Sequence, residues 1–143
     1  MKRIFQIIIL CIVLLSCLSS CTNGKVENIK ETTKENMTVN DTVYENITAK
    51  EAKRIMDTQT GYVILDVRTQ EEYDEKHIPE AILIPDYEIH EKAEGILMDK
   101  SQLILVYCRS GRRSKLAAEN LLKLGYTNIK EFGGIIDWPY ETE

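Results

Sequence analysis

One short segment, Cys108-Arg-Ser-Gly-Arg-Arg-Ser114, combines a nucleophile with several positive charges and a glycine. A cysteine thiolate is a strong nucleophile, and positive charges and backbone N–H groups around the sulfur favour it over the thiol. Three arginines, at positions 109, 112 and 113, supply the charges, and Gly111 permits a tight loop with positive φ. A lone cysteine after an apolar strand is most often a core residue, but these neighbours favour a reactive Cys108 and an anionic substrate.

The patterns on either side of this segment explain how its backbone can reach the sulfur. Leu103 to Tyr107 is the strongest strand pattern in the chain. Ser114 to Leu124 has helical spacing, with an inner face formed by Leu116, Ala117, Leu121 and Leu124. A loop between a strand and a helix N-terminus can direct its N–H groups at an anion. We therefore expect Cys108 to be catalytic and the substrate to be bound by Arg109, Ser110, Gly111, Arg112, Arg113 and Ser114.

The rest of the chain alternates strand and helix patterns, which is typical of an α/β fold. Strands are predicted at residues 43–47, 62–65, 81–84, 103–107 and 128–132, and helices at 48–57, 71–76, 86–94 and 114–124. Thr48 and Glu51 form a capping-box pattern, Asp86 is a candidate cap of the third helix, and Gly95 and Gly125 are candidate helix stops. We expect a mainly parallel central sheet of about five strands with helices on both faces. Active sites of such sheets lie beyond the carboxyl ends of the strands, where the sequence places Cys108.

The N-terminal residues have the pattern of an export signal. Lys2 and Arg3 precede an apolar run, Ile4 to Leu15, that is shorter than the about 20 residues of a membrane-spanning helix. Leu18-Ser19-Ser20-Cys21 resembles the bacterial lipobox, in which a small residue precedes a cysteine that is lipidated. We expect residues 1–20 to be a lipoprotein signal peptide and Cys21 to carry the lipid; a plain secretory signal is the alternative. The lipid would anchor the protein to a membrane of the bacterial cell envelope, outside the cytoplasm.

A polar segment, residues 21–42, separates this signal from the first strand pattern. It is rich in Lys, Glu, Asn and Thr and has no apolar periodicity, so we expect a flexible tether. The folded domain is then predicted to span residues 43–143.

Cysteine and charge counts restrict the chemistry further. Of the four cysteines, Cys11 and Cys17 lie in the signal and Cys21 in the lipobox, so Cys108 is the free thiol and dithiol chemistry is excluded. Removing residues 1–20 takes away two of the 18 basic residues and none of the 23 acidic ones, which changes the formal charge from −5 to −7. This balance argues against nucleic acid as a partner.

Four motifs resemble, in the same order, those of the rhodanese family. They are Asp66-Val-Arg68, Glu72-Tyr-Asp-Glu-Lys-His77-Ile-Pro79-Glu-Ala81, Cys108-Arg-Ser-Gly-Arg-Arg-Ser114, and Gly133-Gly134 with Trp138. Lys76 and Glu80 stand where the family commonly has glycine, which puts the local turn geometry in question. We interpret Asp66 and Arg68 as an ion pair that fixes loops, and His77 as structural.

The resemblance implies a thiosulfate sulfurtransferase with a rhodanese-like fold. It implies that Cys108 takes sulfane sulfur from thiosulfate or a similar donor as a persulfide and passes it to a thiophilic acceptor, without a metal or other cofactor. Two alternatives are a non-catalytic or persulfide-carrier module and a cysteine phosphatase. A phosphatase loop has an arginine six residues after the cysteine, whereas Ser114 stands there in this chain, so the loop is one residue short for phosphate.

Overall fold

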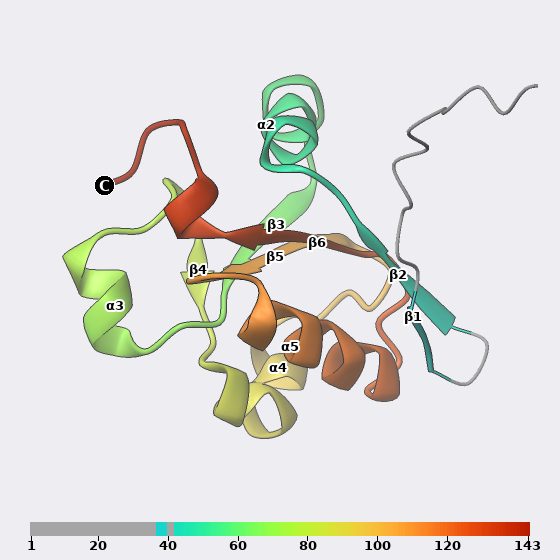
Figure 1. The fold of residues 1–143 in the computed structure, drawn as a ribbon. Coiled ribbons are helices and arrows are strands. Elements are labelled where there is room, and N and C mark those ends of the chain that lie inside the picture. Colours follow the sequence, from blue (N-terminus) through green and yellow to red (C-terminus); the bar gives the residue numbers. More distant parts are fainter. Residues whose placement is uncertain (1–36, 40–41) are drawn as a thin grey trace, which may run out of the picture. The chain divides into compact units, whose positions relative to one another are not determined.

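The computed structural model describes residues 37–39 and 42–143 and shows an α/β fold (Figure 1). Within these residues one sheet has six strands in the order β1-β2-β6-β5-β3-β4. The strands are β1 (Met37–Val39), β2 (Thr42–Asn46), β3 (Tyr62–Asp66), β4 (Ile82–Leu83), β5 (Leu103–Cys108) and β6 (Ile129–Gly134). All neighbours from β2 to β4 pair in parallel, and β1 alone is antiparallel to its neighbour β2. The predicted mainly parallel α/β sheet is confirmed.

Helices cover both faces of the sheet. They are α2 (Ala49–Thr58), α3 (Gln70–Glu75), α4 (Ile89–Ile96), α5 (Arg112–Lys123) and the 3₁₀ turns η1 (Asp86–Glu88) and η2 (Ile135–Asp137). Figure 1 shows α2 and η2 on one face and α4 and α5 on the other. Among the described residues, no helix is long and apolar enough to cross a membrane.

Strand β5 lies between β3 and β6 and divides the hydrophobic core into two clusters. Side chains alternate across a strand, so Ile104, Val106 and Cys108 pack with α4 and α5, whereas Leu105 and Tyr107 pack with α2 and Trp138. Both faces of β5 are therefore buried, which explains its unbroken apolar sequence. The alternation also determines that the Cys108 side chain faces α5.

The helix starts follow the sequence patterns in part. Thr48 caps α2 by accepting the N–H of Glu51 at 3.1 Å, but the Glu51 carboxylate pairs with Arg54 instead of completing a capping box. A full capping box forms at α3, where Thr69 accepts the N–H of Glu72 and the Glu72 carboxylate accepts the N–H of Thr69. Glu72 is thus held at the start of α3, where its carboxylate also reaches Arg113 of the segment 108–114.

Two predicted helix boundaries and one inner-face residue are wrong. Asp86 does not cap α4, because Pro85 leads into the 3₁₀ turn η1 and α4 begins only at the buried Ile89. Gly95 lies inside α4 and does not end it. Leu116 is 45% exposed, because it lies about 100° around the helix from Ala117 and outside the buried stripe of Ser114, Ala117, Ala118, Leu121 and Leu122. Gly125, with φ 90°, ends α5 as predicted.

The structure also differs from the predicted tether boundary at residue 43. Strand β1 lies within residues 21–42, and its backbone pairs with β2 in the register Thr38↔Val43. Residues 1–20 and Cys21 lie outside the described residues.

Candidate active site

Cys108 is the last residue of β5, at the carboxyl edge of the sheet, and its side chain is 1% exposed. The pairing of β5 with β6 shifts register between Val106 and Cys108, so that Cys108 lies opposite Gly134. The backbone then turns at Gly111, whose φ of 95° is a left-handed conformation that favours glycine. Helix α5 starts at the next residue, so the sulfur lies beside a helix N-terminus, as predicted.

Backbone N–H groups of this loop surround the sulfur. The N–H of Gly111 donates a hydrogen bond to Cys108 Sγ at 3.1 Å. Burial alone would raise the pKa of the thiol, but hydrogen bonds from the N–H groups of Ser114, Ser110 and Gly111 lower the Cys108 pKa below its ordinary value. The arrangement favours a thiolate, the reactive form of cysteine.

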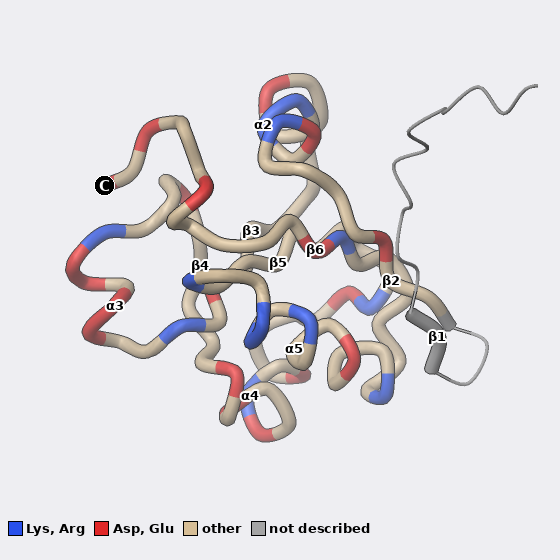
Figure 2. The backbone as a smooth tube through the Cα atoms, in the orientation of Figure 1, with Lys and Arg blue, Asp and Glu red and all other residues tan. Residues whose placement is uncertain are grey.

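The three loop arginines differ in their surroundings. Arg113 forms a bidentate ion pair with Glu72 of α3, with N–O distances of 2.6 and 2.8 Å. Hydrogen bonding from Arg113, supported by the Thr69 N–H, lowers the pKa of Glu72 to about 2 against the opposing effect of burial. Arg109 and Arg112 are exposed, and neither side chain has a hydrogen bond or ion pair with the part of the chain that the structure describes. These two guanidinium groups are therefore available to an anion. In the backbone view of Figure 2, blue Lys and Arg positions lie where β5 passes into α5.

Two residues of β6 complete the loop: Glu131, which the sequence analysis missed, and Gly134, which it named only as part of a family motif. Glu131 is 3% exposed, and its Oε1 lies 2.6 Å from Ser114 Oγ and 2.9 Å from the Gly133 nitrogen. Gly134 packs so closely on the loop that a Cβ there would lie 2.2 Å from the Arg109 carbonyl oxygen. Glu131 could have been found from its spacing: it lies two residues after the apolar Ile129, so both side chains point to the same buried face of the strand.

Asp66 and Arg68 form a buried ion pair, as the sequence analysis interpreted them. The Arg68 Nη2 lies 2.6 Å from Asp66 Oδ2 and also donates to the Lys76 carbonyl at 2.7 Å. His77 stacks on Tyr73 with ring centroids 3.8 Å apart, and its Nδ1 lies 3.0 Å from the Tyr73 carbonyl oxygen, as expected for a structural residue.

The two departures from the family's glycines have different consequences. Glu80 has a φ of 65°, in the left-handed region where glycine is favoured. Lys76 has a φ of −173°, an extended conformation that any residue adopts. The backbone therefore has the conformation that favours glycine at Glu80 but not at Lys76.

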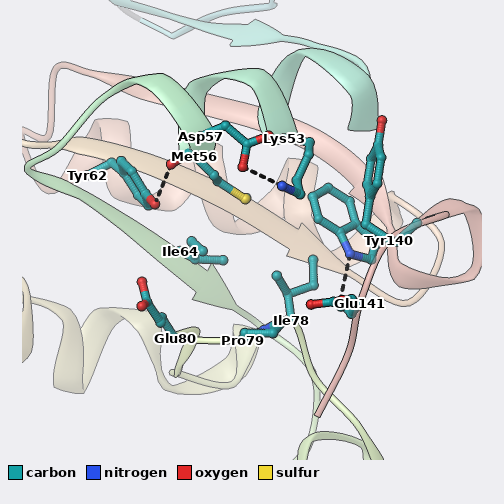
Figure 3. A pocket seen from close by; sticks show the side chains of 11 residues that line it. Lys53, Met56, Asp57, Tyr62, Ile64, Ile78, Pro79, Glu80, Tyr140 and Glu141 are labelled. Carbon is teal, nitrogen blue, oxygen red and sulfur yellow. Dashed lines mark hydrogen bonds and ion pairs between the residues drawn. The ribbon is translucent and has the colours of Figure 1, made fainter.

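A pocket of about 200 Å³ lies on the α2 side of the sheet (Figure 3). It is lined by Lys53, Met56, Asp57, Tyr62, Ile64, Ile78, Pro79, Glu80, Trp138, Tyr140 and Glu141. No loop residue from 108 to 114 contributes to it. In the described ranges, no group of three or more His, Cys, Asp or Glu side chains could hold a metal ion.

A mainly parallel sheet with a buried cysteine at its carboxyl edge, in a loop lined with N–H groups, defines the class of protein: an α/β domain that carries a cysteine where a strand passes into a helix. The chain belongs, within that class, to the family of the rhodanese-like domain, whose family model matches residues 48–139.

Known relatives agree with this assignment. The chain is 40% identical over 73 residues to "Thiosulfate sulfurtransferase PspE" of Escherichia coli (strain K12), which covers 51% of this chain and 70% of that protein. It is 36% identical over 98 residues to "Putative sulfur carrier protein YrkF" of Bacillus subtilis (strain 168), of whose length it spans about half, 52%. The crystal structure of a rhodanese-related protein from Thermoplasma volcanium superposes with a TM-score of 0.61 at 30% identity, covering 70% of this chain and 98% of that chain.

Proposed function

We propose that this chain is a sulfurtransferase that carries sulfane sulfur on Cys108, from thiosulfate or a similar donor to a thiophilic acceptor. The observation that carries the proposal is the Gly111 N–H at 3.1 Å from Cys108 Sγ, in a loop that lowers the thiol pKa. Membership of the rhodanese-like family and relatives named sulfurtransferases support it.

In the first half-reaction the Cys108 thiolate attacks the outer sulfur of thiosulfate. The new S–S bond forms as the bond to the sulfonate sulfur breaks, and that electron pair leaves with sulfite. The product is the persulfide anion Cys108–S–S⁻, whose charge the loop N–H groups stabilise. Arg109 and Arg112, which are exposed, attract the anionic donor to the loop.

In the second half-reaction a thiophilic acceptor attacks the outer sulfur of the persulfide. With cyanide, the S–S bond breaks, thiocyanate leaves and the Cys108 thiolate is restored. Charge and electrons balance in both steps without another reactant. Donor and acceptor react in turn with the same sulfur, so the kinetics are ping-pong.

Turnover of thiosulfate and cyanide to thiocyanate tests this proposal. The chain is expected to show parallel lines in double-reciprocal plots, and Cys108→Ser to lose all turnover. Ser101→Ala is the matched control, because it shortens an exposed serine side chain outside the Cys108 loop. Equal turnover by Cys108→Ser and the unchanged chain would contradict the proposal.

A persulfide carrier is the second candidate, because a relative is named a putative sulfur carrier protein. A carrier would accept sulfur on Cys108 from thiosulfate but release little thiocyanate, and would lose its sulfur to a protein thiol.

A phosphatase fits the loop less well. Ser114 stands where a phosphatase has its arginine, and its hydroxyl contacts Glu131.

We also propose that Cys21 is lipidated and holds the domain at a membrane outside the cytoplasm, on the support of the lipobox at residues 18–21. Radioactive palmitate fed to producing bacteria should label the chain, and Cys21→Ser should abolish the label and move the protein out of the membrane fraction. Cys17→Ser is the matched control and should keep both. Undiminished label in Cys21→Ser would contradict the proposal.

A further inference from the structure

The Ser114 hydroxyl has one hydrogen but several possible acceptors. Its Oγ lies 2.6 Å from Glu131 Oε1, 3.0 Å from the Gly111 carbonyl, 3.4 Å from the Gly133 carbonyl and 3.5 Å from Cys108 Sγ. A hydroxyl can donate to one of them fully at a time. The direction of this hydrogen therefore decides whether Ser114 stabilises the Cys108 thiolate.

Distance and charge both favour the carboxylate. A hydroxyl donating to a carboxylate forms a strong hydrogen bond of about 2.5–2.7 Å, which is the separation found at Glu131. The Gly133 N–H donates to the same oxygen at 2.9 Å and so fixes its position. Ser114 is fully buried and Glu131 is 3% exposed, so water does not compete at Ser114.

We propose that Glu131 is a positioning residue that takes the hydroxyl hydrogen of Ser114 and so leaves the Cys108 sulfur to the backbone N–H donors of its loop. The Ser114 hydroxyl then contributes nothing to the thiolate, although it lies within reach of the sulfur. A thiolate with one donor fewer is a stronger nucleophile, because nucleophilicity falls together with the pKa of the thiol. This last consequence rests on the proposed function; the hydrogen-bond assignment does not.

Charged groups of the loop and its neighbours also act on the thiol pKa, so the test variants leave all of them except Glu131 unchanged. They are the arginines Arg109, Arg112 and Arg113 and the carboxylates Glu72 and Asp86 that act on Arg113. Replacing Glu131 removes a negative charge, which by itself favours the thiolate whether or not Ser114 is involved. The experiment therefore needs Glu131→Gln in two backgrounds.

The pH midpoint of Cys108 alkylation by iodoacetamide reports the thiol without any sulfur transfer. Ser114→Ala is expected to leave the midpoint unchanged. Glu131→Gln is expected to lower it, because the weaker amide acceptor releases the hydroxyl to the sulfur. Glu131→Gln in the Ser114→Ala background should shift the midpoint by about one unit less than it does with Ser114 present. In a Ser114→Thr background, which keeps a hydroxyl at position 114, Glu131→Gln should shift the alkylation midpoint as much as it does with Ser114 present.

Two outcomes would overturn the proposal. If Ser114→Ala alone raises the midpoint, the hydroxyl donates to the sulfur in the unchanged chain. If Glu131→Gln shifts the midpoint equally in both backgrounds, Glu131 acts by charge alone. Glu119→Gln, which removes one negative charge from α5, is the control for long-range charge. If Glu131→Gln does not fold, Ser114→Ala alone still decides whether the hydroxyl donates to the sulfur. Loss of sulfur transfer with unchanged alkylation midpoints would fault the proposed function instead.

Discussion

Glu80 carries backbone strain that the rest of the fold maintains. It is the only described residue other than glycine with a positive φ, 65°. A Cβ in this left-handed region meets the following carbonyl oxygen, at a cost of about 1–2 kcal/mol that glycine avoids. A glycine at position 80 would avoid this cost, but it would also give the unfolded chain more conformational freedom, which offsets part of the gain in stability.

Glu80→Gly is therefore expected to raise the free energy of unfolding by about 1 kcal/mol. Glu80→Ala keeps the Cβ and should give no such gain. Lys76→Gly, at an extended residue, should lower stability instead. Urea denaturation of the three variants measures the differences, and a gain for Glu80→Ala as large as for Glu80→Gly would show that side-chain charge, and not backbone strain, is responsible.

Helix α3 is attached to the active loop by one ion pair, Glu72–Arg113. The capping box fixes Glu72 at the start of α3, and the bidentate contact then fixes the Arg113 guanidinium near the Cys108 loop. The pKa of Glu72 in the fold is about 2, below its value in an unfolded chain. The pair therefore stabilises the fold fully above the unfolded pKa of about 4.3, and this contribution is lost as pH falls towards 2.

Glu72→Gln is expected to lower the free energy of unfolding at pH 7 by about 1 kcal/mol, because both groups of the pair are partly exposed to water. The difference from the unchanged chain should shrink as the pH is lowered from about 5 to 2. Glu75→Gln, at the exposed end of the same helix, should have little effect at either pH. A Glu72→Gln difference that stays constant over this range would contradict the assigned ion pair.

For the whole molecule, the sequence predicted what is local and periodic. The mainly parallel sheet follows from the alternation of strand and helix patterns. The buried strand before Cys108 and the helix after it follow from the apolar run at residues 103–107 and the spacing of Ala117 and Leu121. Contacts between distant segments could not be predicted, such as Glu72 with Arg113 and Glu131 with Ser114. Strand β1 has only three residues, too few for an alternating pattern. Leu116 was misplaced because Leu116 and Ala118 lie about 100° to either side of Ala117 and both are apolar, and the buried face is the one on the Ala118 side.

The central claim is that sulfur travels on Cys108, and the mass of the intact protein after reaction with thiosulfate tests it most directly. The account predicts a mass gain of one sulfur atom, located on the peptide that contains Cys108, absent in Cys108→Ser and removed by cyanide with release of thiocyanate. An unchanged mass under conditions in which iodoacetamide alkylates Cys108 would contradict it, because the thiolate would then be present and reactive but unable to take sulfane sulfur.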